Sequence, residues 1–202
     1  RGCATVATVA GPLDWTALRS LEAPAPVPAS GPMPASFAGV APFATHAVPV
    51  VVHADACEVD VNAASQLEGL RVVVVDFENP RDQALHFALT TSAAATLDVG
   101  GVPTVRRTFD AGGRQTTRFG SIEVPAGRVR TVVKFAQRGD GSTVEVDAFG
   151  DDGQPLTAHA PRRGDVATAV PKGRATPLAI APASRDPEEL MLAAAGMLGF
   201  GD

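Results

Sequence analysis

The densest set of side chains that could hold a metal ion lies in the stretch HADACEVD, residues 53–60. It contains His53, Asp55, Cys57, Glu58 and Asp60. Imidazole, thiolate and carboxylate groups are the usual protein ligands of zinc and other transition metals. On a strand, alternation would place His53, Asp55 and Cys57 on one face. The same pattern is typical of a strand with polar residues facing water and one buried cysteine, and we prefer that interpretation to a metal hydrolase.

Sequence motifs of catalysis do not stand out. No Gly-x-Ser-x-Gly elbow supplies a serine nucleophile. The turns that begin at Asp98 and Asp110 contain Gly-Gly, but no Gly-Lys-Ser/Thr follows to form a phosphate loop. We therefore predict a protein that is not an enzyme, with no catalytic residue, no metal and no cofactor.

Arginines recur in the middle of the chain. They are Arg106, Arg107, Arg114, Arg118, Arg128 and Arg130. Such a group could bind an anionic glycan or an acidic partner protein. We prefer the interpretation that they lie on a solvated sheet face, where charges also block edge-to-edge pairing.

Composition narrows the class of protein. The 202 residues carry a formal net charge of −5, so the chain lacks the basic field that binds nucleic acid. Tyrosine is absent and Trp15 is the single tryptophan, which leaves few aromatic platforms for bases or sugars. No run of apolar residues is long enough to predict a transmembrane helix.

Short apolar runs separated by turn residues fill residues 47–158. The runs are rich in Val, Thr and Phe, and the separators include Asn79-Pro80, Gly100-Gly101 and Pro125-Ala126-Gly127. The pattern predicts an all-β fold, an antiparallel immunoglobulin-like sandwich of about 7–8 strands. We expect the link RGDGST, residues 138–143, to close a hairpin between the last two strands.

Alternation assigns faces within these strands. In residues 128–135, the pattern places Val129, Thr131, Val133 and Phe135 on a core face, and Arg128, Arg130, Val132 and Lys134 on a wet face. The run LRVVVVDF, residues 70–77, is apolar on both faces. It predicts a central strand with one face in the core and the other beneath an N-terminal arm or a partner.

The flanks predict three further parts. Residues 1–46 should hold a short helix over 12–21, capped by Asp14, and a Pro-rich arm that extends from Leu21 to Pro49. Residues 159–185 are linker-like. Residues 186–202 predict a helix with Asp186 at the N-cap and Pro187 in the first turn. This helix is apolar on nearly every side, so we expect partner contacts through Leu190, Met191, Met197 and Phe200, and also through Trp15.

The two cysteines, Cys3 and Cys57, leave two alternatives open. A disulfide between them would close a long loop and would require an oxidising compartment. The opening Gly2-Cys3-Ala4-Thr5-Val6 resembles instead the cleavage junction of a bacterial lipoprotein. That resemblance implies a lipid on Cys3 and membrane attachment through it.

Two further segments carry resemblances. The phrases VVVVDFENPRDQALHFAL and SIEVPAGRVRTVVKF resemble bacterial immunoglobulin-like accessory domains over residues 68–149, although the antibody-type Cys-Trp-Cys core is absent. The end, LAAAGMLGFGD, resembles the beginning of a tetratricopeptide helix, which implies a chain that continues into a scaffold for protein contacts.

These observations predict a non-enzymatic, extracytoplasmic structural or interaction module of a bacterium, in the periplasm, on the outer membrane surface or secreted. Its partners would be other protein subunits in a larger assembly, contacted through the Pro-rich arm and the terminal helix. The alternative is a carbohydrate-binding module of a secreted protein, with a glycan as its ligand.

Overall fold

The computed structural model describes residues 2–15, 18–41, 43, 46–54, 56–107, 115–137 and 143–178. Within these ranges the only α-helix is the five-residue α1 (Leu18–Glu22), and a single 3-10 turn, η1, spans Val61–Ala64. All pairings between the described strands are antiparallel. The prediction of an all-β fold with antiparallel sheets is confirmed.

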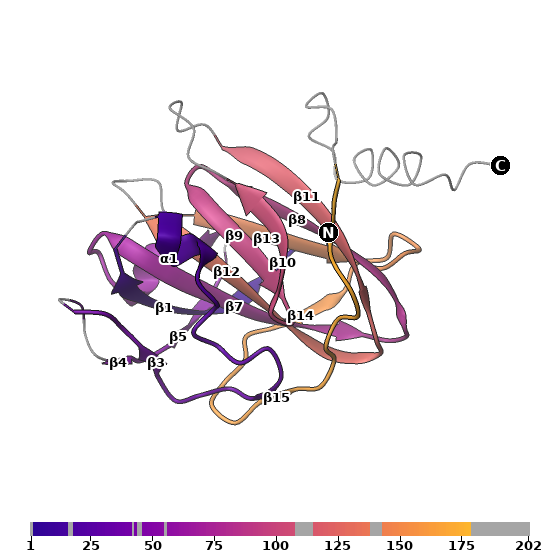
Figure 1. The fold of residues 1–202 in the computed structure, drawn as a ribbon, viewed down its shortest axis with the longest axis horizontal. Helices are drawn as coiled ribbons and strands as arrows, with labels where there is room; N and C mark the ends of the chain where they lie inside the picture. The colour runs from indigo at the N-terminus through magenta and orange to yellow at the C-terminus, as the bar shows by residue number, and fades with distance from the viewer. Residues whose placement is uncertain are drawn as a thin grey trace.

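Two large sheets organise the chain (Figure 1). The seven-stranded sheet contains, in spatial order, β10 (Val102–Arg107), β9 (Ala94–Val99), β12 (Gly127–Gln137), β7 (Gly69–Asn79), β1 (Val6–Asp14) and β5 (Val50–His53), with β14 (Thr157–His159) also paired to β7. The five-stranded sheet contains β16 (Thr176–Leu178), β11 (Thr116–Val124), β8 (Gln83–Thr91), β13 (Thr143–Phe149) and β6 (Val59–Asp60). Two small ribbons pair β2 (Gly31–Pro32) with β15 (Val166–Ala167), and β3 (Phe37–Ala38) with β4 (His46–Ala47).

The main core lies between the two large sheets. β7 contributes Val73, Val75 and Phe77, and β8 contributes Phe87 together with its neighbours at alternate positions. The Phe77 and Phe87 rings meet edge to face, with centroids 6.1 Å apart. On β12, Val129, Thr131, Val133 and Phe135 are all buried, which confirms the core face predicted from their alternation.

Chain segments cross repeatedly from one sheet to the other. β7 and β8 belong to different sheets, as do β11 and β12, so the predicted turns at Asn79-Pro80 and Pro125-Ala126-Gly127 are crossovers. The side-chain amide of Asn79 joins them, donating to the carbonyls of Val124 (3.0 Å) and Pro125 (2.9 Å). These two distant turns are thereby held as one structural unit.

Hairpin geometry occurs at Gly100-Gly101. β9 and β10 pair across these two residues, whose φ angles of +51° and +82° suit a tight type I′ turn. The hairpin predicted at residues 138–143 is wrong, because β12 and β13 lie in different sheets and do not pair. Residues 138–142 themselves lie outside the described residues.

The N-terminal segment differs from its predicted structure. Residues 12–14 end strand β1, and α1 begins only at Leu18, so the helix expected over 12–21 is wrong in its first half. β1 is strand because it lies between β7 and β5, where its backbone pairs on both sides and Ala7 and Val9 are buried. The sandwich was predicted over residues 47–158. The large sheets also include β1, which precedes residue 47, and β16, which follows residue 158.

The outer face of the seven-stranded sheet is covered. Figure 1 shows the indigo and purple early part of the chain running along one side of the sheets. A second apolar cluster forms there, in which Val27, Met33 and Phe37 pack on Val72 and Val74 of β7 and on Val132 of β12. The central strand therefore has both faces buried, as its continuous apolar run predicted.

Charged side chains on that outer face are buried as well, so the wet face predicted for β12 is wrong. Arg130 is 0% exposed and donates to both carboxylate oxygens of Asp76, at 2.9 and 3.0 Å. It also donates to the carbonyls of Asp165 (3.0 Å) and Gly31 (3.3 Å). The covering segments thus supply backbone acceptors that replace water for this guanidinium.

Lys134 is satisfied in the same way. Its ammonium group donates to the carbonyl of Ala23 and lies 3.4 Å from a carboxylate oxygen of Asp98. Arg71 donates to the side chain of Gln137 and to the carbonyl of Leu67. Arg71 has the strand parity of Val73 and Val75, so it lies on the inner face of β7, where desolvation by burial lowers its pKa to about 10.

Candidate functional site

The exposed aromatic residue Trp15 centres a surface that we call the Trp15 patch: Trp15, Val40 and Phe43. The Trp15 side chain is 53% exposed and that of Val40 54% exposed, although both are large and apolar. The Trp15 and Phe43 rings meet edge to face, with centroids 5.1 Å apart. Leu67, which is 66% exposed, lies two residues before β7. Exposed apolar groups that gather in this way mark interaction surfaces in soluble proteins.

Backbone contacts hold the patch in place. The Val40 N–H donates to the carbonyl of Leu13 at 2.7 Å, and the Phe43 N–H donates to the carbonyl of Val40 at 3.0 Å. Asp14 accepts from the Trp15 N–H and from the Ser20 hydroxyl, each at 2.7 Å. The Asp14 carboxylate therefore links Trp15, which follows the end of β1, to Ser20 in α1.

Gly69 permits the close approach beneath the patch. Its φ is +145°, and a side chain there would place Cβ 2.6 Å from Pro12 Cβ and 3.4 Å from the Phe43 ring. The absence of a side chain lets the start of β7 come directly beside the end of β1. The patch thus lies beside the end of β1 and the start of β7.

The predicted partner contacts divide into two groups. Trp15 is exposed, as a contact residue must be. Leu190, Met191, Met197 and Phe200 lie outside the described residues, so their role stays a prediction. The Pro-rich arm, by contrast, already uses Val27, Met33 and Phe37 to cover the chain's own sheet.

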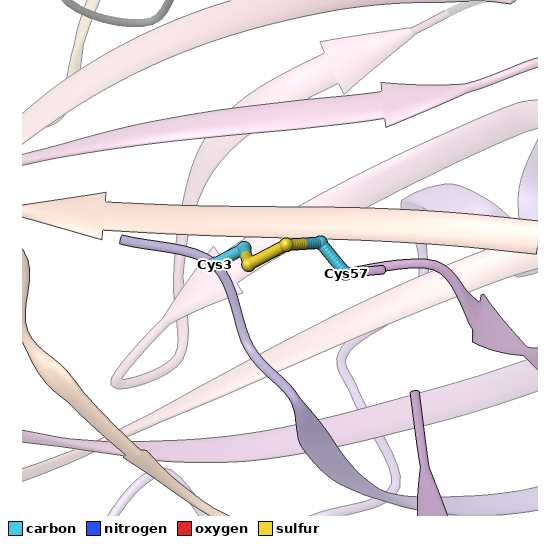
Figure 2. Close-up of a disulfide and its surroundings, with 2 residues drawn as sticks. All are labelled: Cys3 and Cys57. Carbon is cyan, nitrogen blue, oxygen red and sulfur yellow. A yellow bond between two sulfur atoms is a disulfide. The ribbon is translucent and has the colours of Figure 1, made fainter. Parts of the chain in front are cut away.

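Cys3 is bonded to Cys57. Figure 2 shows the two side chains joined by the sulfur–sulfur bond, which connects residues 54 positions apart. Residues 2–4 pair with β13, since the Ala4 N–H donates to the Val146 carbonyl and the Ala148 N–H to that of Gly2. A sulfur in a disulfide cannot also carry a thioether-linked lipid, so this structure and the lipidated form of Cys3 are mutually exclusive states.

Residues 53–60 do not converge as metal ligands in the part of the chain that the structure describes. No group of three His, Cys, Asp or Glu side chains there could hold a metal ion. Cys57 is committed to the disulfide, and Asp60 accepts from the Asn62 N–H at the start of η1, at 2.8 Å. His53 ends β5, and Asp55 lies outside the described residues.

The arginines expected on one solvated face are dispersed. Arg130 and Arg107 are buried, and Arg107 donates to the Thr116 hydroxyl at 2.8 Å. At the surface, Arg106 pairs with Glu22 at 2.7 Å and Arg128 with Glu78 at 2.8 Å. Arg118 lies on β11 of the other sheet, and Arg114 is outside the described residues. The described arginines therefore form no shared anion site.

His86 lies partly buried on β8. Burial lowers its pKa, and Nδ1 is buried without a hydrogen-bond partner. It lies on the outer side of β8, while Leu85, Phe87 and Leu89 point into the core. An imidazole held neutral by burial fits a structural place on the sheet better than a charged contact.

Val40, Phe43 and Leu67 were not predicted as site residues. In the sequence, Val40 and Phe43 fall in a Pro-rich stretch where apolar residues carry no periodic signal. Their exposure depends on the fold, because the neighbouring Phe37 in the same stretch is buried.

Comparison of the chain with protein-family models, curated proteins and solved structures found no match. Among the described residues, no helix has the length and apolar character needed to cross a membrane. The structure defines an antiparallel all-β protein with a disulfide between Cys3 and Cys57.

Proposed function

We propose that the chain is a non-enzymatic, extracytoplasmic structural or interaction module, built on an immunoglobulin-like sandwich, that docks on partner proteins. The observation that carries this proposal is the Trp15 patch, where the Trp15 and Phe43 rings meet and Val40, bonded through its backbone to Leu13 of β1, is exposed. Tryptophan is among the residues that contribute most to protein interfaces, because it buries a large area with little loss of conformational freedom.

The disulfide supports the proposed extracytoplasmic location. Disulfides form and persist in oxidising environments, such as the periplasm and the extracellular space. Cys3–Cys57 ties the N-terminal residues, which pair with the five-stranded sheet, to the segment that leads into β6. Closing a loop of this length stabilises a fold by roughly 2–4 kcal/mol.

Part of the predicted docking surface is used within the chain, because Val27, Met33 and Phe37 of the Pro-rich arm cover its own sheet. We therefore assign partner contact to the predicted residue Trp15 together with Val40 and Phe43, which belong to the same arm. The terminal helix over residues 186–202 remains a second predicted contact. A tetratricopeptide continuation beyond it would suit the same role in a larger assembly.

Site-specific photo-crosslinking tests this proposal. A photoreactive residue at Val40 (54% exposed) should capture one defined protein from the source organism, and the same residue at Val166 (49% exposed) should not. Unlabelled wild-type chain should compete for capture, and the Trp15→Ser chain should compete at least about tenfold less well. Equal capture at both positions, or equal competition by Trp15→Ser, would contradict the proposal.

A carbohydrate-binding module is the alternative, because an exposed indole can stack on a sugar ring. A glycan array distinguishes the two functions. Binding of the wild-type chain to a defined glycan, lost in Trp15→Ser, would favour the alternative. An array without binding removes it.

A further inference from the structure

Strand β5 is an open edge of the seven-stranded sheet. It pairs only with β1, with Val50 opposite Val9 and His53 opposite Val6. The Ala54 N–H donates to the Thr5 carbonyl at 2.9 Å, in the same register. Because backbone groups alternate in direction along an antiparallel strand, Val50, Val52 and Ala54 bond to β1. The N–H and C=O groups of Val51 and His53 therefore point away from the sheet.

Those outward groups have no protein partner in the described part of the chain. The strand carries no charged residue, and Val50 and Val51 are 38% and 39% exposed. The sheet's opposite edge, β10, contains Pro103 and two arginines, which block added strands. In the other sheet, β16 contains Pro177 and β6 ends in Asp60. β5 is thus less protected than the edges formed by β10, β16 and β6.

We propose that β5 pairs with β5 of a second copy of this chain, in antiparallel orientation about a two-fold axis. The register that places Val51 opposite His53 of the other copy satisfies the outward N–H and C=O of both residues on both copies. It also places the two Val52 side chains opposite each other in the intervening non-hydrogen-bonded pair. The two seven-stranded sheets become one continuous sheet.

Three features select a second copy over a foreign strand. The edge is self-complementary, because one register bonds all of its open groups. Pro49, which lacks an N–H, falls just outside that register and limits the ladder to its length. The absence of charge along β5 means that pairing brings no like charges together, whereas the chain as a whole carries −5. This inference does not depend on the Trp15 patch.

The Val51→Pro variant isolates the proposed contact. The Val51 N–H points outward, so proline there removes a bond to the second copy and keeps every bond to β1. Val51→Thr is the matched control, since it keeps the N–H and the β-branched shape. Val51→Lys is a second disrupting variant that retains the backbone, as lysine does on natural protected edges.

The experiment combines sedimentation equilibrium with amide hydrogen exchange on the full chain. Wild type and Val51→Thr should dimerise with concentration, and the His53 amide should become protected in step. Val51→Pro and Val51→Lys should each weaken dimerisation about tenfold or more, while the Val52 amide stays protected by β1. A chain that is monomeric at millimolar concentration, or a dimer that persists unchanged in both disrupting variants, would overturn the proposal.

Discussion

The two faces of the seven-stranded sheet are both buried, but by different chemistry. On the inner face, β12 presents Val129, Val133 and Phe135 to an apolar core that the other sheet completes. On the outer face, the same strand presents Arg130 and Lys134, which are covered by irregular chain. Between Val129 and Phe135, the inner face of β12 needs apolar area, whereas its outer face needs a partner for each charge.

Because of this difference, substitutions on the two faces should affect the stability of the fold in different ways. Apolar burial is roughly proportional to area and has no direction, so its loss is graded. A buried charge is tolerated only with its counterion and hydrogen bonds, and removing one partner leaves the other uncompensated. The inner face should therefore respond to lost volume and the outer face to lost pairing.

The largest expected effect is on the inner face. Phe135 is 0% exposed, so Phe135→Ala should lower the free energy of unfolding by about 4 kcal/mol, through lost transfer energy and a residual cavity. Urea unfolding followed by circular dichroism measures it. The control is Val170→Ala, at a side chain that is 43% exposed, where we expect a change within about 0.5 kcal/mol. A loss below about 1 kcal/mol for Phe135→Ala would mean that the core can refill the space.

The next effect is on the outer face. Asp76→Ala leaves the guanidinium of Arg130 buried without its carboxylate, and should lower the free energy of unfolding by about 3 kcal/mol. The double variant Asp76→Leu with Arg130→Met should recover most of that stability, since an apolar pair of similar volume carries no desolvation penalty. If the double variant is as unstable as Asp76→Ala, the pair is not the reason for the loss.

The inner face could be predicted from the sequence because alternation in residues 128–135 is a local signal. The outer face could not, because Arg130 in a strand looks the same whether water or a covering segment lies over it. Val27, Met33 and Phe37 show why: the Pro-rich stretch has no period that would reveal which of its side chains are buried. Only the doubly apolar run of residues 70–77 indicated that something must cover the sheet.

The candidate site was less predictable than the fold. Trp15 was predicted as a contact residue, but Phe43 and Val40 join it through a ring contact and through backbone bonds to Leu13 and Val40 that the sequence does not reveal. The strand β1 was missed because helical spacing of Trp15, Leu18 and Leu21 competes with it locally. Pairing with β5 and β7 decides the outcome, and that pairing is not local.

The smallest expected effect is a pH dependence of stability that distinguishes Asp98 from Asp76, the two buried acids of the outer face. Asp98 has one oxygen 3.4 Å from the Lys134 ammonium, and its other oxygen is buried without a hydrogen-bond partner. Burial raises the pKa of Asp98, against the opposing effect of Lys134. In the window above the unfolded value of 3.8, the folded state holds the proton more tightly, so this residue's contribution to stability falls as pH rises.

Asp98→Asn removes that titration. The difference in unfolding free energy, variant minus wild type, should therefore become more favourable to the variant between about pH 3 and pH 7. Urea unfolding of both proteins across that range measures it. Glu22→Gln is the control, because its exposed pair with Arg106 should contribute less than about 1 kcal/mol at every pH. A difference that stays constant or moves against Asp98→Asn would show that the Lys134 ammonium compensates the Asp98 carboxylate fully, as Arg130 compensates Asp76.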